Sequence, residues 1–381
     1  MSQPAAGPSG FLRSGGWVVV TAVVLATIAF AFHARDLVRR RARPVGDGRR
    51  VESYGFALSP CRVPRDLIAA SGMAKDALTA LVDPPAWTTA QADAAITRHS
   101  KFLVPGDRVI GLVAGGQARA YPLRMMVWHE VVNDTLGGLP VAVTYNPLCD
   151  SAVAFRGDVG GRRPTFGFSG LVYQSSLLMY DRQPGGRGES LWSQLAFRAV
   201  AGPAAADGAE LTVLPISVEP WSDWRREHPD TTVLAQDPEM AEKYASDPYV
   251  TYAGADELRF PVRPLPAPAA WPLKTPVVAI GGPAGWTAFP FPVLAAGGEP
   301  LTSPPTPSAA IAFALTYHAR GPWVTVNPDA LPPGSGVVYA SYFAWFATHS
   351  ADTTWAGATT ETGVRGQGSG TRERQQNGTR R

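Results

Sequence analysis

Short apolar runs separated by glycine-rich turns fill the middle of the sequence, and they restrict the fold more than any other feature. The first two pairs of runs flank Ala114-Gly115-Gly116 and Gly137-Gly138, and the third flanks the glycine-rich stretch 157–161. Two short apolar runs joined by such a turn predict a β-hairpin. The three pairs are 108–112 with 118–121, 130–134 with 140–145, and 152–155 with 165–168. Three successive hairpins predict an antiparallel meander rather than alternating β-α-β units.

Composition and the remaining runs agree with a β-rich chain. The run 171–180 predicts one further strand, and the segment 217–227 predicts a short helix or turn that stops before Pro229. The 39 Gly and 36 Pro residues favour frequent turns over long helices, and a hydrophobic content of 45% suits a packed core. We therefore expect a mainly β (α+β) fold built from antiparallel hairpins.

Three segments in the first half of the chain have counterparts, in the same order, in the second half. The pairs are 108–123 with 276–291, 151–155 with 308–313, and 220–235 with 341–357. The shared order predicts a degenerate second copy of the main domain; similar hairpins that arose independently are the alternative. The expected division is a main domain at 53–260, a Pro-rich linker at 261–276 and the repeat at 277–357. The stretch 128–149 lacks a counterpart, which points to the first copy as the one that carries a site.

An uncharged apolar run occupies residues 17–32. It is slightly shorter than the ~20 residues that span a bilayer, and two preceding glycines extend it. We expect a single transmembrane helix at 15–33, between an N-terminal tail at 1–14 and a basic linker at 34–52. The alternatives are a cleaved signal peptide, because Ala29-Phe30-Ala31 fits a cleavage site, and a buried core helix.

The net charge of +3 conceals an uneven distribution. The first 50 residues carry eight Arg against two Asp, and the last 25 carry five Arg against two Glu, so residues 51–356 sum to about −6. A mildly acidic folded region argues against nucleic acid as a partner. The positive flank beside the apolar run instead predicts contact with the lipid bilayer and its anionic headgroups. Residues 358–381 lack apolar periodicity and predict a disordered tail.

The densest group of chemically capable side chains lies within 128–194. The second predicted hairpin places His129 just before one strand and Cys149 just after its partner, so the two could approach each other. With Met179 they would form a soft ligand set suited to copper. A Cys149 nucleophile with His129 as base, and Glu130 as a neighbouring general base, is a second interpretation. The third is structural, with a hydrogen-bonded His129 and a buried, inert Cys149.

Polar side chains also alternate along the predicted strand 171–180 and its end. Residues on one side of a strand recur at every second position, so some of these side chains share a face. Those that could line a cleft and contact a cofactor or ligand are Tyr173, Ser175, Tyr180 and Asp181. An ordinary half-exposed strand is the alternative.

Six sequence blocks carry a family resemblance. In chain order they are ARAYPL, WHEVVNDTLGG, VAVTYNPLCDSAVAF, SGLVYQSSLLMYDR, ESLWSQ and HPDTT. Over about residues 55–260 the chain resembles the family catalogued as domain of unknown function 3179. The resemblance implies a related fold and similar site positions but no reaction. Many family members carry export signals, which implies an extracytoplasmic domain, whereas the Arg residues after the apolar run indicate the cytoplasmic side.

One loop departs from the family pattern. The family typically has Cys-Pro-Leu-Cys after the VAVTY strand, whereas this chain has Asn146-Pro147-Leu148-Cys149. A dithiol couple or a two-thiolate metal site in that loop is therefore in doubt for this chain. Cys61 is the one other cysteine, and its pairing with Cys149 stays open.

The sequence leaves the function unknown among three classes. The first is a membrane-anchored binding or accessory domain that holds a soft metal near His129 and Cys149. The second is a hydrolase or transferase that depends on Cys149, and the third is a structural or interaction domain. The nucleophile elbow, the phosphate loop, the H-E-x-x-H motif and the dinucleotide fingerprint do not occur in a fitting context.

Overall fold

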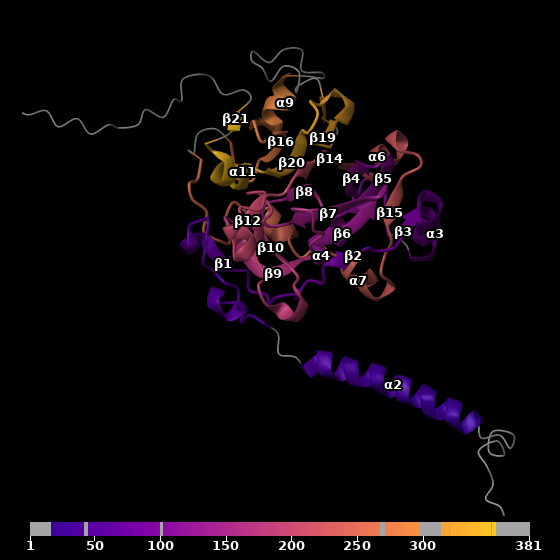
Figure 1. Ribbon diagram of the computed structural model, residues 1–381. Coiled ribbons are helices and arrows are strands. Elements are labelled where there is room, and N and C mark those ends of the chain that lie inside the picture. The colour runs from indigo at the N-terminus through magenta and orange to yellow at the C-terminus, as the bar shows by residue number, and fades with distance from the viewer. Residues whose placement is uncertain are drawn as a thin grey trace, which may run out of the picture.

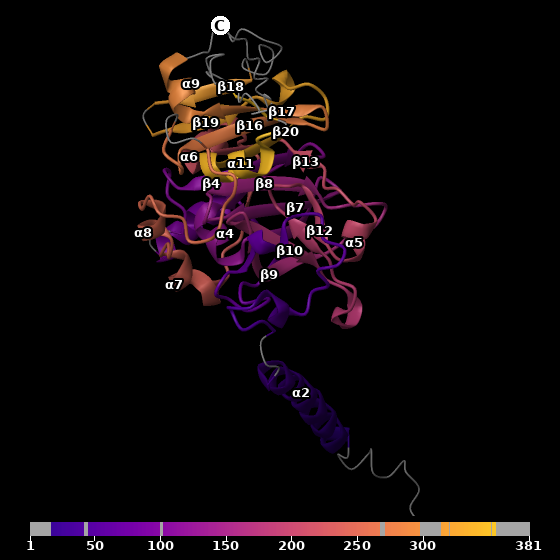
Figure 2. The same ribbon diagram turned by 90° about the vertical axis from the view of Figure 1, so that its left-hand side faces the viewer.

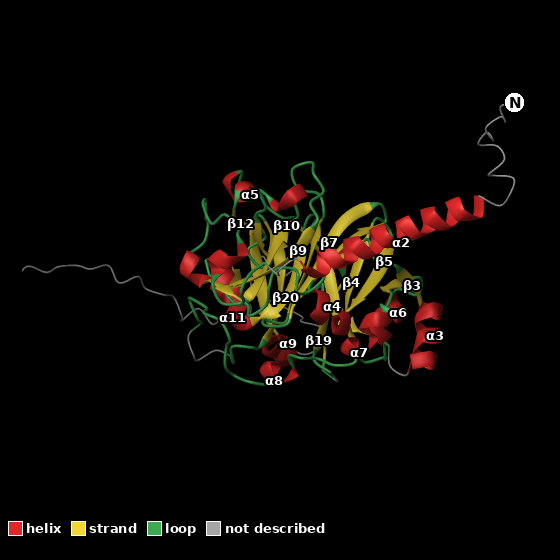
Figure 3. Ribbon diagram, turned by 90° about the horizontal axis from the view of Figure 1, so that it is seen from below, coloured by secondary structure: helices red, strands yellow, loops and turns green. Residues whose placement is uncertain are grey.

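Most strands of the chain gather into three neighbouring β-sheets (Figure 1). The computed structural model describes residues 17–41, 45–99, 102–266, 271–297, 314–319, 321–351 and 353–355. The strands lie in the interior and short helices lie around them (Figure 3). Antiparallel pairs predominate, with a few parallel pairs at sheet edges, so the expected β-rich class is confirmed.

Helix α2 (Trp17–Arg41) projects from the folded body (Figures 1 and 2). Among the described residues, no helix combines the length and the apolar character needed to cross a membrane. The transmembrane helix expected at 15–33 is therefore not supported, and α2 continues into the expected basic linker as far as Arg41. Residues 1–14 and 358–381, expected to be tails, lie outside the described residues. Lipid contact and localisation stay predictions.

The first sheet contains the first predicted hairpin, which is confirmed by the pairing of β4 with β5. In order, its strands are β18 (Leu315–His318), β19 (Trp323–Val326), β14 (Ile216–Pro220), β4 (Arg108–Ala114), β5 (Gln117–Pro122), β15 (Thr232–Leu234) and β3 (Ala86–Thr88). The turn of this hairpin lies against the turn of the next one. A Cβ on Gly115, where φ is 55°, would lie 2.1 Å from the carbonyl oxygen of Gly137. Only glycine allows this approach, so the turn sequence fixes how the two hairpins meet.

The second sheet joins the second predicted hairpin, β6 with β7, to the C-terminal part of the chain. In order, its strands are β2 (Leu81–Val82), β6 (Val131–Leu136), β7 (Leu139–Asn146), β8 (Ser151–Arg156), β20 (Gly336–Ser341), β16 (Pro276–Gly282), β17 (Gly285–Pro290) and β21 (Thr353–Trp355), and β13 (Val213–Leu214) also pairs with β8. The pairing of β20 with β8 means that strands within 277–357 extend a sheet of the main domain. Strand β19 does the same for the first sheet through β14.

Two predictions about the third sheet are wrong. Its strands are β1 (Ile68–Ala70), β9 (Phe166–Tyr173), β10 (Ser176–Asp181), β11 (Leu191–Ser193) and β12 (Arg198–Ala201). The third expected hairpin does not form, because β9 pairs with β1 and β10 while β8 stays in the second sheet. The run 171–180 is not one strand, because a turn at Gln174 and Ser175 separates β9 from β10. Both turn residues have positive φ (54° and 61°), a conformation that non-glycine sequences rarely signal.

The helices cap strand ends and connect sheets. The segment 217–227, expected to be a short helix or turn, divides between strand β14 and helix α6 (Trp221–Glu227). The other α-helices are α3 (Thr89–His99), α4 (Leu123–His129), α5 (Pro203–Ala206), α7 (Ala241–Tyr244), α8 (Val250–Ala253), α9 (Phe291–Gly297) and α11 (Tyr342–His349). Short 3-10 helices are η2 (Val51–Tyr54), η3 (Arg65–Leu67), η4 (Pro184–Gly186), η5 (Pro238–Met240) and η6 (Pro328–Ala330).

Two groups of four strands share one topology. The first unit is β14, β4, β5 and β15, and the second unit is β20, β16, β17 and β21, each in spatial order. In both units the first two pairs are antiparallel and the last is parallel. Trp224 Nε1 donates to Thr231 Oγ1 at 2.9 Å beside the first unit, and Trp345 Nε1 donates to Thr353 Oγ1 at 3.0 Å beside the second. This topology accommodates the sequence repeat, and the duplication itself stays a prediction.

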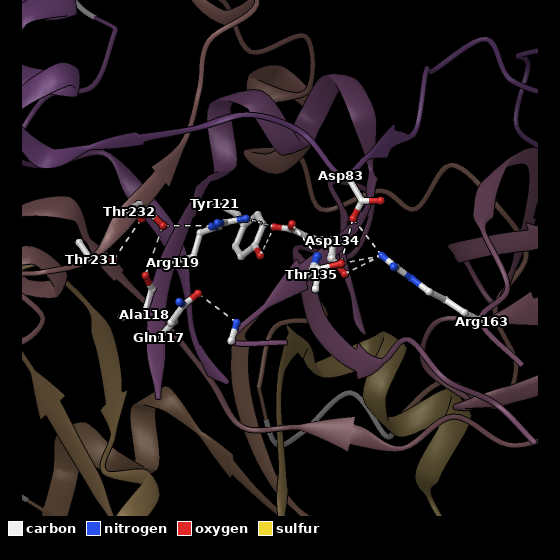
Figure 4. A network of polar contacts seen from close by, with 11 residues as sticks. Asp83, Gln117, Ala118, Arg119, Tyr121, Asp134, Thr135, Arg163, Thr231 and Thr232 are labelled. Atoms are coloured by element: carbon white, nitrogen blue, oxygen red, sulfur yellow. Dashed lines mark hydrogen bonds and ion pairs between the residues drawn. The ribbon is translucent and has the colours of Figure 1, made fainter. Parts of the chain in front are cut away.

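A buried ion pair connects the first and second sheets (Figure 4). Arg119 Nη1 of β5 lies 2.6 Å from Asp134 Oδ2 of β6, with side chains that are 14% and 3% exposed. The same carboxylate accepts hydrogen bonds from the Tyr121 hydroxyl at 2.8 Å and from the Thr135 backbone N–H at 2.7 Å. Arg163 adds a more exposed contact, 2.9 Å long, to the hydroxyl of Thr135. These contacts offset the desolvation cost of the buried Asp134 carboxylate, and they link the two sheets.

Candidate functional site

The loop that joins β7 to β8 positions Cys149 inside the protein. Its thiol is 1% exposed and contacts Asn146 Oδ1 at 3.4 Å and Ser151 Oγ at 3.1 Å. The next residue, Asp150, has a φ of 42°. Positive φ at a non-glycine residue costs free energy and clusters at functional sites, so this loop is a candidate on backbone grounds alone.

The side-chain amide of Gln194 forms hydrogen bonds with several polar groups close to Cys149. Its Oε1 accepts hydrogen bonds from Ser151 Oγ at 2.6 Å and from Ser176 Oγ at 3.2 Å. Its Nε2 donates to Thr144 Oγ1 at 3.0 Å and to the Ser151 carbonyl at 3.2 Å. The amide therefore uses both of its ends, and it ties β7 and β8 of the second sheet to β10 of the third.

Glu130 joins the same set of contacts from the other side. It ends helix α4 with a φ of 55°, is almost fully buried, and accepts a hydrogen bond from Asn146 Nδ2 at 3.2 Å. Burial raises the pKa of Glu130 to about 8. The resulting chain, which we call the Cys149 network, consists of Glu130, Asn146, Cys149, Ser151 and Gln194. Asn146 links two members of this network, Glu130 and Cys149.

The environment of Cys149 favours the thiol over the thiolate. Burial raises the pKa of Cys149 to about 12, although the hydroxyls of Ser151 and Ser176 act in the opposite direction. The thiol is therefore protonated near neutral pH. Nucleophilic attack and coordination of a soft metal both require the thiolate, so neither role is prepared in this arrangement.

His129 has partners other than Cys149. Its Nδ1 lies 2.7 Å from the carbonyl oxygen of Thr79, so Nδ1 carries the proton, and Nε2 then accepts from the hydroxyl of Tyr244 at 2.6 Å. Burial lowers the pKa of His129, which keeps the imidazole neutral. Both ring nitrogens are occupied, and none of the contacts between described residues joins this ring to the thiol.

The proposed soft-metal set is only partly brought together. Met179 of β10 lies in the same apolar cluster as Cys149, whereas the ring of His129 is hydrogen-bonded to Thr79 and Tyr244. In the part of the chain that the structure describes, no group of three or more His, Cys, Asp or Glu side chains is arranged to hold a metal ion. Cys61 and Cys149 are both free thiols.

The four side chains expected to line a cleft lie in different surroundings. Tyr173 and Tyr180 pack in a separate apolar cluster beside β1, and the Tyr180 hydroxyl donates to Asp76 Oδ2 at 2.5 Å. Asp181 Oδ1 accepts the Ser190 backbone N–H at 2.5 Å at the far end of β10. Of the four, only Ser175 lies near the Cys149 network.

A segment rich in tyrosine, residues 238–264, covers the network, and sequence reasoning missed it. Tyr244 bonds His129, and burial with the nearby Glu130 carboxyl raises the pKa of Tyr249 to about 12. Burial raises the pKa of Tyr252, and the neighbouring Cys149 adds to that rise. The three tyrosines thus neighbour His129, Glu130 and Cys149 in turn. Their close spacing in a polar stretch was the available signal in the sequence.

The contact between this covering segment and the network is incompletely bonded. Gln174 holds the segment by donating to the carbonyl of Arg263 and by accepting from its backbone N–H at 2.8 Å. Beside it, the buried hydroxyls of Ser175 and Tyr252 lie close to each other, and among the described residues neither has a partner at good hydrogen-bond geometry. Buried polar atoms rarely lack a well-aligned hydrogen bond, so these two hydroxyls remain able to bond a further group.

Asp150 directly follows Cys149 in the chain, and its side chain lines a cavity of 570 Å³. Arg108 Nη1 and Nη2 lie 3.2 Å from the Asp150 carboxylate, and the Tyr145 hydroxyl donates to Asp150 Oδ1 at 2.8 Å. The side chains of Arg108 and Asp150 are 47% and 38% exposed, so a ligand can reach them. The rest of the wall is mainly apolar and includes Phe291, Trp323 and Tyr339. The cavity lies between the two four-strand units, since strands β4, β14, β16 and β20 all contribute to it.

Comparison with known proteins gives one match. A family model described as "Protein of unknown function (DUF3179)" matches residues 75–313, more than half of the chain. That range contains the Cys149 network and the covering segment. No curated protein and no solved structure matches the chain.

Proposed function

This chain belongs to the DUF3179 family, whose function is unknown, and on that premise we propose that its folded part binds a small, largely apolar ligand beside Arg108 and Asp150. The observation that carries the proposal is the strained loop around Cys149, which presents the Asp150 carboxylate and its arginine partner at the wall of the 570 Å³ cavity. Ligand pockets typically have volumes of about 300–1,000 Å³ and apolar walls with a few well-placed polar groups.

The polar end of the cavity favours a particular class of ligand. Arg108 and Asp150 form a neutral pair that offers N–H donors and carboxylate acceptors side by side. A primary amide or a zwitterion can satisfy both partners at once. A singly charged ligand attracts one member of the pair and repels the other, so it gains less. The aromatic wall near Trp323 suits an apolar or planar remainder of the ligand.

The Cys149 network supports binding over covalent chemistry. Attack by Cys149 requires a thiolate, and burial works against that form. His129 would have to exchange both of its present partners to serve as the base. The network is therefore better suited to hold Asp150 in its strained conformation than to react.

Titration calorimetry of the full chain with phenylacetamide, L-phenylalanine and phenylacetate tests the proposal. We expect the amide and the zwitterion to bind, and phenylacetate to bind more weakly. Asp150→Asn should weaken binding roughly tenfold or more, because a hydrogen bond to a charged group contributes about 1.5–3 kcal/mol. Asp158→Asn is the matched control, since Asp158 forms a similarly exposed pair with Arg156. If Asp150→Asn and Asp158→Asn bound the probes with equal affinity, the proposal would be contradicted. Absence of binding by all three probes would contradict it as well.

A further inference from the structure

The opposite face of β14 borders a second cavity, of 390 Å³. Side chains alternate along a strand, so Val218 and Pro220 face the first cavity while Ser217 and Glu219 face the second. Helix α6, strands β4, β18 and β19 and the 3-10 helix η6 also contribute to the wall. This cavity is separate from the Arg108–Asp150 site and takes no part in the function proposed above.

A buried carboxyl and a buried hydroxyl lie in the wall of this cavity. Glu219 is 1% exposed and Ser217 is 7% exposed, and among the described residues neither Glu219 Oε2 nor Ser217 Oγ has a partner at good hydrogen-bond geometry. The Ser217 hydroxyl lies close enough to Glu219 to oppose the rise of its pKa. Both atoms can accept a hydrogen bond, and they lie two residues apart on one strand face. A buried carboxyl and a buried hydroxyl that share a cavity wall are therefore available to a donor that enters it.

The charge of the cavity wall determines which kind of hydrogen-bond donor the cavity favours. Among its lining residues are the carboxyl groups of Glu219, Glu227 and Asp329, whereas Lys and Arg are absent from the lining. The cationic side chain of Arg226, next to the lining residue Glu227, already contacts Asp223 and lies 3.6 Å from Glu227. The cavity therefore attracts cations, and neither Lys nor Arg lies within its wall to compete for them. His228 also lines the wall, and burial lowers its pKa, which favours the neutral imidazole.

We propose that this cavity is a binding site for an organic ammonium ion, whose N–H groups donate to Glu219 Oε2 and Ser217 Oγ. A metal ion fits less well, because the described residues contain no group of three potential ligands arranged to hold one. An ammonium group needs only one carboxylate and one or two neutral acceptors. The Trp224 ring, which packs directly against Gly111, gives the same wall an apolar surface for a substituent.

Protonation of Glu219 couples this site to pH. Burial raises the pKa of Glu219 to about 7, so a large fraction of the carboxyl is neutral in the free protein. The titratable and charged groups that face it or share its cavity are Asp223, Arg226, Glu227, His228, Asp329 and Tyr339. A bound cation favours the carboxylate, so binding releases a proton. Affinity should therefore rise from about pH 6 to about pH 8.

Titration calorimetry of the full chain with phenethylamine, and with 2-phenylethanol as the neutral match, tests the site. We expect one phenethylamine per chain, bound roughly tenfold or more tightly than the alcohol, with proton release and higher affinity at the higher pH. Equal affinities for the amine and the alcohol would overturn the proposal, as would displacement of the amine by equimolar Mg²⁺ or Ca²⁺. This comparison uses the unaltered protein, so it tests whether the chain binds an ammonium ion even if a variant fails to fold.

Matched variants locate the bound amine. Glu219→Gln should reduce phenethylamine affinity roughly tenfold or more and abolish its pH dependence, while binding of 2-phenylethanol stays the same. Glu52→Gln replaces an exposed carboxyl and should change neither the affinity for phenethylamine nor the pH dependence of that affinity. Asp150→Asn should also leave amine binding intact, which separates this site from the first cavity. Unchanged amine binding by Glu219→Gln would refute the assignment.

Discussion

Replacement of Glu130 by Gln tests the buried network through the pH dependence of folding. Burial raises the pKa of this carboxyl from 4.5 to about 8 in the folded chain. Between these values the unfolded chain carries a carboxylate while the folded chain holds the acid, so folding takes up a proton. The contribution of Glu130 is therefore fully present below about pH 4.5 and is lost as the pH rises toward 8. Between about pH 5 and about pH 8 the loss amounts to roughly 4 kcal/mol.

Glutamine has the shape of the protonated acid and can still accept the hydrogen bond from Asn146 Nδ2. We expect Glu130→Gln to match the original chain near pH 5 and to exceed its free energy of unfolding progressively toward pH 8. Urea unfolding followed by tryptophan fluorescence at several pH values measures this difference. Glu52→Gln, at an exposed position, should follow the original chain throughout. Parallel pH profiles for the original chain and Glu130→Gln would show that Glu130 ionises freely in the folded protein and would refute the argument.

Two further predictions concern the ion pairs and the thiols. Arg119→Met leaves the buried Asp134 without its cation and should cost roughly 3–5 kcal/mol, whereas Arg163→Met removes a side chain that is 46% exposed and should cost about 0–1 kcal/mol. Equal urea midpoints for the two variants would contradict the role given to the buried pair. In the native protein iodoacetamide should label Cys61 well before Cys149, because Cys149 is buried and its pKa is raised. Rapid labelling of Cys149 in peptide mass spectrometry would favour the nucleophile hypothesis instead.

Local sequence chemistry was sufficient for the first two hairpins. Their turns contain Gly115 and Gly137, and glycine adopts the positive φ of these turns without a steric penalty. The turn at Gln174 and Ser175 has the same backbone requirement without glycine. Its conformation is held by contacts between Gln174 and Arg263, 89 residues away, so a local reading took it for a continuous strand.

The candidate site likewise combines features that the sequence predicted with contacts that only the fold shows. Sequence alone selected Glu130 and Cys149, and the structure links them through Asn146. The proposed contact of His129 with Cys149 rested on their nearness to one hairpin. In the fold, His129 is held instead by Tyr244, which lies 115 residues further along the chain.

The sequence by itself determined the β-rich class, the family and the residues that carry polar chemistry, because turn propensity, apolar patterning and motif identity are local properties. Only the tertiary structure decided which of those residues meet, which are buried and which protonation states they adopt. These depend on sheets assembled from distant strands, such as β8 with β20, and on a covering segment that removes water from Cys149 and Glu130. Burial and long-range contact set the pKa and the hydrogen-bond partners of a group, and neither is encoded at the position of that group alone.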